Sequence, residues 1–227
     1  MTNLVSNTGV VATDTTGVGT AREDLEAAGY GTDKAIFGYG INSGGRVSMT
    51  NLVSNTGVVA TDTTGVGTAR QSLAAAGYGS DKAIFGYGFS DSGRVSMTNL
   101  VSNTGVVAND VTGVGTARYH LAAAGYGTDK AIFGYGYSSI PSVSMTNLVS
   151  NTGVVANDVT GVGMGRYSLA AAGYGTDKAI FGYGYASSES PPRVSITNLV
   201  SNTGVVATDT TGVGTARDSL AAASYGT

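Results

Sequence analysis

Three observations predict an all-β repeat fold. The stretch "NLVSNTGVVA" recurs about every 48 residues, and the last step is 51 residues; its copies begin at Asn3, Asn51, Asn99, Asn147 and Asn198. Each complete copy contains four strand-length runs separated by Gly or polar turns. The 227-residue chain has 36 Gly, no Cys, no Trp and a net charge of −3. Because one copy is too small to bury a core, we expect a single domain over 1–227, with units at 1–48, 49–95, 96–144, 145–195 and 196–227.

The four runs of the first complete unit are "LEAAGYG" at 25–31, "KAIFGYG" at 34–40, "RVSMTNLVS" at 46–54 and "TGVVATDTT" at 56–64. The last three are rich in β-branched or aromatic residues and are predicted strands. The first run is rich in Ala, which favours helix, but it is too short and Gly-Tyr-Gly follows. A strand of small side chains suits a place where sheets converge on a crowded axis. Four strands per unit and about five units indicate a five-bladed β-propeller with one incomplete blade; the alternative is a β-solenoid.

The segment "AREDLEAAGYGTDKAIFGYG" at 21–40, with the two runs that follow, resembles a kelch repeat. The resemblance implies that an Arg precedes the innermost strand and that the second strand ends in a pair of glycines. Here Tyr39 separates those glycines, and the Trp usual in the fourth strand is absent. Blade length and five-fold repetition are also similar to tachylectin-type lectin propellers, whose Trp-bearing motifs are missing too.

How the last blade would close depends on which of the four strands of a unit is innermost and which is outermost. In kelch order, the first residues supply the third and fourth strands of that blade, and 220–226 supplies its first. Its second strand would be missing, so the blade is defective, a neighbouring chain donates the strand, or the chain is a fragment. If 34–40 were instead the outermost strand, only an edge strand would be absent. An unpaired strand edge inside a blade is costly and promotes association.

Sequence differences between the copies fall into two sets. One set is the pair after each repeated Arg: Glu23-Asp24, Gln71-Ser72, Tyr119-His120, Tyr167-Ser168 and Asp218-Ser219. The other follows the second strand, at 41–46, 89–94, 137–142 and 185–193. Because the strands of a blade run alternately up and down, both sets are expected on one face. The near-invariant "GYGTDK" and "VSNTG" turns then lie on the opposite face, a pattern typical of a scaffold that presents binding loops.

Aromatic residues outside the repeated framework all lie in these variable segments. They are Phe89, Tyr119, His120, Tyr137, Tyr167 and Tyr185. Tyr beside small polar residues is typical of adaptable recognition loops, so these six residues are the predicted ligand-binding residues. The competing interpretation is that loops vary because they tolerate change. His120 has no Cys or second His as a companion, so we predict neither a metal site nor a cofactor.

A repeated Asp precedes a repeated Arg by eight residues. The arginines are Arg22, Arg70, Arg118, Arg166 and Arg217. The pattern predicts five ion pairs or turn-capping contacts between blades. The alternative is a ring of arginines that grips an anion at the axis, and for that reason the five arginines join the candidate ligand-binding residues. Asp33, before Lys34, is predicted to cap a tight turn through its side chain.

The sequence gives little support for catalysis. No helix follows the Gly-x-Gly turns, so they are not phosphate loops. Copper oxidases among kelch-like propellers need a Cys and several His, whereas this chain has no Cys and one His. Acids outside the repeated positions are scattered, and near-identical blades are poorly suited to an asymmetric acid–base pair. We therefore predict a protein that is not an enzyme.

The predicted function is a binding or adhesion module that recognises a glycan or a surface protein, extracellular or virion-associated. Near-identical repeats with one diversified face look like modules of phage appendages and bacterial adhesins. The alternatives are a structural subunit of a filament or virion appendage, completed by strand donation within a homo-oligomer, and an artificial or trimmed piece of a longer array. The scattered Lys and Arg predict no nucleic-acid binding. No apolar stretch reaches membrane-spanning length, and the first residues do not form a signal peptide.

Overall fold

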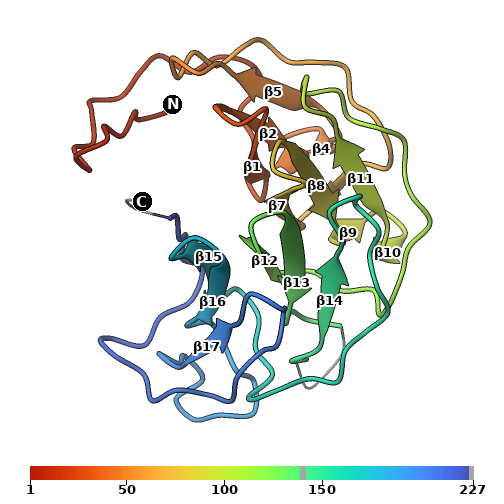
Figure 1. Cartoon of the computed structure of the whole chain (residues 1–227). Helices are drawn as coiled ribbons and strands as arrows, with labels where there is room; N and C mark the ends of the chain where they lie inside the picture. The colour runs from red at the N-terminus through yellow and green to blue at the C-terminus, as the bar shows by residue number, and fades with distance from the viewer. Residues whose placement is uncertain (139–141, 225–227) are drawn as a thin grey trace.

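A computed structural model describes residues 1–138 and 142–224, and the regular structure in these residues is entirely β (Figure 1). Four similar antiparallel sheets, each with three main strands, dominate it. We number them sheets 1 to 4 in chain order: β1-β2-β5, β7-β8-β11, β12-β13-β14 and β15-β16-β17. The sheets stand side by side in an arc around a central opening, and the two ends of the chain face each other across a gap (Figure 1). The all-β prediction is confirmed.

Each sheet has the same three strands. The first strands are β1 Glu26–Tyr30, β7 Ala74–Tyr78, β12 Ala122–Tyr126 and β15 Ala170–Tyr174. The second strands are β2 Lys34–Gly38, β8 Lys82–Gly86, β13 Lys130–Gly134 and β16 Lys178–Gly182. The third strands are β5 Thr50–Val53, β11 Thr98–Val101, β14 Thr146–Val149 and β17 Thr197–Val200. The second strand is central in every sheet, so the alternative phase, with this strand outermost, is wrong.

The predicted fourth strand does not form as a continuous strand. In sheet 1 the outer segment touches β5 through two isolated bridges, Thr50↔Thr63 and Val53↔Val59. Between them the side-chain amide of Asn51 donates to the carbonyl oxygen of Ala60 at 3.1 Å. Backbone hydrogen bonds such as Ala60 N–H to the Leu52 carbonyl also join the two segments, so the outer segment is paired with β5 but not as a regular strand.

Short strands lie beside these sheets, at the end where the second strand finishes. They are β3 Ile41–Asn42, β4 Gly45–Arg46, β6 Arg70–Gln71, β9 Phe89–Ser90 and β10 Gly93–Arg94. They pair as β3-β4 and β10-β9-β6. The second pairing joins the residues after the repeated Arg to the loop after the second strand, so the two variable sets of the sequence are neighbours.

The first strands of adjacent sheets lie close together because their side chains are small. A Cβ placed on Gly77 would lie 3.4 Å from the carbonyl oxygen of Gly29, and one on Gly125 would lie 3.5 Å from that of Gly77. The Ala-Ala-Ala-Gly run therefore forms a strand at a crowded axis, as predicted, and packing overrides the helical propensity of Ala.

The core lies between neighbouring sheets, not within one. Phe85 of sheet 2 packs on Gly38 of sheet 1, where a Cβ would approach the ring to 2.7 Å. The same ring meets the Tyr39 ring edge-on, with 5.2 Å between centroids. Sheets 2 and 3 repeat this contact through Phe133, and sheets 3 and 4 through Phe181. Each interface thus buries one large ring against a glycine that admits it.

The two ends of the chain carry parts of a fifth unit. At residues 1–21, the bridges Thr2↔Thr15 and Val5↔Val11 reproduce the contact between a third strand and its outer segment. Residues 217–224 lie beside sheet 4: the Ser219 N–H donates to the Ser168 carbonyl at 2.8 Å, and the Ser224 hydroxyl donates to the Gly173 carbonyl at 3.0 Å. No described residue occupies the second-strand position between the two segments.

Candidate ligand-binding face

The six predicted aromatic residues form one continuous row. Ring centroids are 5.2 Å apart for Phe89 and Tyr119, 5.5 Å for Tyr119 and Tyr137, and 5.4 Å for Tyr137 and Tyr167. Tyr185 follows Tyr167 at 5.1 Å. All six side chains are half-buried. The row therefore spans sheets 2, 3 and 4 on a single face and keeps part of each ring accessible. We call it the aromatic row.

Backbone pairing holds the row in place. Tyr119 pairs with Tyr137, and Tyr167 pairs with Tyr185, each through an isolated antiparallel bridge. Each bridge joins the residue after a repeated Arg to the first residue of the loop after the second strand. The rings of a pair consequently project side by side, and the row is built on the ends of the sheets.

His120, the sixth residue of the row, contacts two of its tyrosines. Its ring is 4.8 Å from that of Tyr119 and 6.2 Å from that of Tyr167. Burial lowers the pKa of His120, and the nearby carboxylate of Asp24 partly opposes that effect. The ring is therefore largely neutral near pH 7 and can both donate and accept a hydrogen bond.

A chain of backbone hydrogen bonds runs through the second residue of each variable pair. The N–H of Ser72 donates to Asp24, that of His120 to Ser72, that of Ser168 to His120, and that of Ser219 to Ser168. All five residues have φ between 51° and 55°. Sequence reasoning missed this arrangement, although Asp, Ser and His are residues that tolerate or favour short left-handed turns.

Two arginines extend the row. The Arg46 guanidinium lies 4.9 Å from the Phe89 ring centroid, and that of Arg94 lies 5.6 Å from the Tyr137 centroid. Arg46 also donates to Asp91 at 2.6 Å, and Arg193 pairs with Asp218. Hydrogen-bonding cations therefore border the aromatic surface, a combination that suits a polar ligand with an apolar face.

The arginines that follow the repeated Asp do not belong to this face. Arg70, Arg118 and Arg166 are fully buried. Arg118 donates to Asn147 at 2.6 Å, lies 3.7 Å from Asp158, and stacks on the Tyr87 ring with its carbon 4.3 Å from the centroid. The three guanidinium groups each donate to an Asn side chain and are closed off from solvent, so they do not form a ring open to an anion.

The predicted ion pairs form within one sheet, between the Arg before its first strand and the Asp of its outer segment, and not between neighbouring sheets. They join Arg22 to Asp62, Arg70 to Asp110, Arg118 to Asp158 and Arg166 to Asp209, with distances from 3.6 to 3.9 Å. The contact between neighbouring sheets is the stacking of Arg on Tyr. Among the described ion pairs, Arg217 has none and its side chain is exposed, although it stacks on Tyr183 at 4.2 Å.

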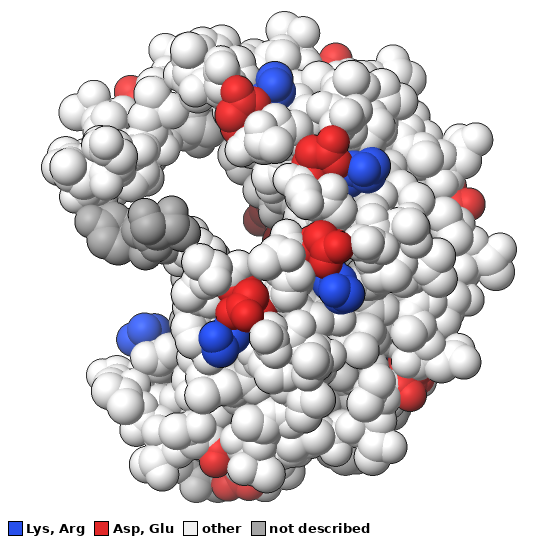
Figure 2. All heavy atoms as spheres, viewed as in Figure 1, with Lys and Arg blue, Asp and Glu red and all other residues white. Residues whose placement is uncertain are grey.

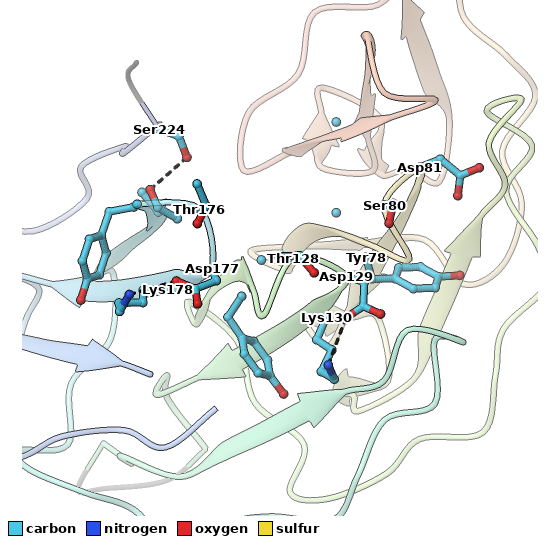
Figure 3. A pocket seen from close by; sticks show the side chains of 18 of the residues that line it. Tyr78, Ser80, Asp81, Thr128, Asp129, Lys130, Thr176, Asp177, Lys178 and Ser224 are labelled. Atoms are coloured by element: carbon cyan, nitrogen blue, oxygen red, sulfur yellow. Dashed lines mark hydrogen bonds and ion pairs between the residues drawn. The ribbon is translucent and has the colours of Figure 1, made fainter. Parts of the chain in front are cut away.

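The opposite face carries the "GYGTDK" turns, which are nearly identical in every complete copy of the repeat. Figure 2 shows acidic and basic side chains in adjacent pairs around the central opening. They are pairs such as Asp129 and Lys130, whose charged atoms are 3.0 Å apart and whose hydrogen bond lowers the pKa of Asp129. The turns enclose a hollow of about 610 Å³, lined by residues such as Thr128, Lys178 and Ser224 (Figure 3). Because each Lys is matched by its own Asp, the hollow has little net charge to select an ion.

Part of the predicted loop at 137–142 lies outside the described residues. In the described residues, no group of three or more His, Cys, Asp or Glu is placed to hold a metal ion. The described part of the chain likewise has no helix long and apolar enough to cross a membrane.

No known protein-family model matches the chain, and no curated protein sequence matches it significantly.

Proposed function

We propose that the four sheets and the two end segments are five units of a β-propeller in kelch strand order, open at the fifth unit. The side-by-side first strands, the central second strands and the core between adjacent sheets support this architecture. A β-solenoid is less suitable, because its units stack along a line and leave no central opening.

We propose that the aromatic row is a binding site and that the protein is a non-enzymatic recognition module. The observation that supports it most directly is the placement of all six non-framework aromatic residues in one row of contacts. If the loops varied only because they tolerate substitutions, aromatic residues would not be expected to gather at one place. Tyr gives a large amphipathic contact area at low entropic cost, as recognition surfaces require.

A glycan is the proposed ligand. The C–H faces of a sugar ring are apolar and pack on aromatic rings, while its hydroxyl groups need hydrogen-bond partners at the edge. Tyr hydroxyls, His120 and the guanidinium groups of Arg46 and Arg94 supply those partners. Because the row crosses three sheets, an oligosaccharide fits it better than a single sugar. A glycan on a cell or particle surface would place the protein outside the cell or on a virion.

A glycan array probed with the purified chain tests this proposal. We expect binding to a restricted group of oligosaccharides, and we expect Tyr167→Ala to weaken it at least tenfold, because Tyr167 contacts three other rings of the row. That loss corresponds to about 1.4 kcal/mol or more. Tyr167→Phe should retain most of the affinity if stacking dominates, and should lose it if the hydroxyl is the main contact.

Tyr174→Ala is the matched control, because Tyr174 is an exposed Tyr on the opposite face, beside the hollow of Figure 3. Circular dichroism melting of each variant shows whether it is folded. Loss of binding in Tyr174→Ala equal to that in Tyr167→Ala would contradict the assignment of the face. A folded protein that binds no glycan on the array would contradict the proposed ligand class.

A further inference from the structure

A large cavity lies between the N-terminal segment and sheet 1, at the open end of the arc, and Ala221 is its one lining residue from residues 217–224. Its volume is about 1220 Å³, and its walls include Met1, Leu4, Val18, Arg22, Phe37 and Ala221. Most of these residues are counterparts of residues that are covered elsewhere in the arc. The three complete interfaces show what covers them there.

In each complete interface, the residue after the second strand is held both by segments of its own sheet and by the next sheet. Tyr39 is the clearest case. Its N–H donates to the Met49 carbonyl at 3.0 Å, its hydroxyl donates to the Val66 carbonyl at 3.2 Å, and the Arg70 guanidinium lies 4.1 Å from its ring centroid. Phe85 meets the same ring edge-on. Four groups therefore enclose one Tyr: Met49 and Val66 flank the third strand and outer segment of the same sheet, and Arg70 and Phe85 belong to the next sheet.

The cavity wall on the side of sheet 1 presents the same four groups without a Tyr among the described residues. Met1, Val18, Arg22 and Phe37 occupy the repeat positions of Met49, Val66, Arg70 and Phe85. Phe37 is half-buried, whereas Phe85 is fully buried; the Arg22 side chain is 4% exposed, against 0% for Arg70. This wall is a preformed receptor for an aromatic side chain at the end of a strand.

At the edge of sheet 4, the glycine that a Phe ring covers in the complete interfaces is uncovered in the described residues. A Cβ on Gly134 would lie 2.6 Å from the Phe181 ring of the following sheet, whereas one on Gly182 would meet only Thr197 of its own sheet, at 3.4 Å. Tyr183 is half-buried, whereas Tyr135 is fully buried. No described ring covers Gly182, so this position can accept a Phe from an additional strand.

The two flanking segments also present unpaired strand edges. Residues 2–5 correspond to a third strand, and Val5 is 63% exposed, whereas Val101, Val149 and Val200 are fully buried. Residues 221–224 correspond to a first strand, and all four are exposed. In sheet 1 the second strand lies between the equivalent segments, with Phe37 opposite both Ala27 and Asn51.

We propose that this cavity is a strand-acceptor site, which binds an extended segment of the type Lys-Ala-Ile-Phe-Gly-Tyr-Gly from a partner chain. By the register of the complete sheets, its Phe lies opposite Ala222 and Asn3 and packs on Gly182. Its Gly packs on Phe37, and its Tyr fills the receptor formed by Met1, Val18, Arg22 and Phe37. Binding completes the fifth sheet by strand addition, in which backbone hydrogen bonds supply affinity and alternate side chains supply specificity.

The occupant is a partner segment and not a strand taken from a second copy of residues 1–224. Each second strand in residues 1–138 and 142–224 already lies between two others, so a second copy would have to break one of these sheets to donate. An extended segment outside any sheet has no such cost. This inference concerns a site at the gap and does not depend on glycan binding at the aromatic row.

A fluorescent peptide with the sequence of residues 127–136, GTDKAIFGYG, tests the site by fluorescence anisotropy against the whole chain. We expect saturable one-to-one binding. Replacing the Phe and Tyr of the peptide by Ser should weaken binding at least tenfold. Gly182→Val should do the same by occupying the space of the Phe, whereas Val106→Ala, at an exposed turn position, should leave binding unchanged.

Three results would overturn the proposal. One is a folded chain that does not bind the peptide at concentrations on the order of 1 mM, the limit of weak specific affinity. Another is equal binding of the native and Ser-substituted peptides, which would indicate only a non-specific strand edge. The third is a concentration-dependent dimer that excludes the peptide, which would assign the site to a second copy. The two peptides are compared on the unaltered chain, so the test holds even if Gly182→Val does not fold.

Discussion

The middle of the arc and its two ends contain the same residues in different surroundings. Phe133, between sheets 2 and 3, is fully buried, whereas Phe37 at the open end is half-buried. Tyr126 is 4% exposed and Tyr174 is 39% exposed. Local sequence is nearly identical in each pair, so the neighbouring sheet determines the difference. The comparison shows that a residue of this repeat contributes to stability mainly through the unit beside it.

This behaviour is expected of a repeat protein, in which each unit contacts only its neighbours. A single sheet buries little apolar surface by itself, because its first strand consists mainly of Ala and Gly. The large side chains, Phe, Tyr and Arg, all project across the interfaces. We therefore expect the stability of the chain to be carried by its three complete interfaces, and each matched pair of residues offers a way to test this.

The largest difference is expected for the repeated Phe. Phe133→Ala removes a ring that packs on Gly86 and Tyr87, and should reduce the free energy of unfolding by about 3–5 kcal/mol, the usual cost of deleting a buried Phe. Phe37→Ala should cost roughly 1–2 kcal/mol, because the Phe37 ring has no such glycine and Tyr among the described residues. Urea unfolding followed by circular dichroism measures both values. Equal losses would mean that the open end is covered in solution.

The repeated Arg should show the next largest difference. Arg118→Ala leaves the Asn147 side-chain oxygen without its donor, removes the positive charge beside Asp158 and removes the stack on Tyr87. A cost of about 3 kcal/mol is expected, at the lower end for a broken buried pair because Asp158 keeps some exposure. The exposed Arg217→Ala should cost less than about 1 kcal/mol. The same urea titration compares them, and a larger loss for Arg217 would contradict the open arc.

Much of the fold could be predicted from the sequence because the repeat shows which positions share an environment. The strand positions, the small first strand at the axis and the single variable face all follow from that pattern. The outer segment could not be predicted, because its pairing depends on a side-chain hydrogen bond from Asn51 to Ala60 that has no signature in the strand pattern. The ion pairs were assigned between blades because Asp14 is close to Arg22 in sequence, whereas the actual partner, Asp62, lies 40 residues later.

For the candidate site, the sequence placed the six aromatic residues on one face, but could not show that their rings touch. That contact depends on bridges such as Tyr119↔Tyr137, which bring together residues 18 positions apart. The sequence could not predict the burial of Arg70, Arg118 and Arg166 either, because a repeated Arg can bind a ligand at the surface or pair with groups in the core. The strand-acceptor site could be recognised only by comparing complete interfaces with the open one.

The first strands contain one exception to the use of small residues at the axis. Glu26 stands where the other sheets have Ala74, Ala122 and Ala170. Burial raises the pKa of Glu26 to about 7, and the negative charge of Asp24 adds to this, against a backbone hydrogen bond from Ala27 that lowers it. The residue also lines the cavity at the open end of the arc. The stability of the first unit is therefore expected to depend on pH through this half-buried acid, which the other units lack.

Glu26→Gln should therefore stabilise the protein in a pH-dependent way. Below about pH 4.5 the carboxyl is protonated in both the folded and the unfolded chain, and the substitution should have little effect. Between pH 4.5 and about 7 the unfolded chain loses the proton while the folded chain keeps it, so rising pH favours unfolding of the native protein. The variant should then be more stable by about 2–3 kcal/mol at pH 8, from 1.36 kcal/mol for each pKa unit and some remaining exposure. Urea unfolding at pH 4 and pH 8 measures the difference, with the exposed Glu23→Gln as the control. A constant difference between Glu26→Gln and the native chain at the two pH values would show that Glu26 is solvated, and that the axis beside the first strand is open to water.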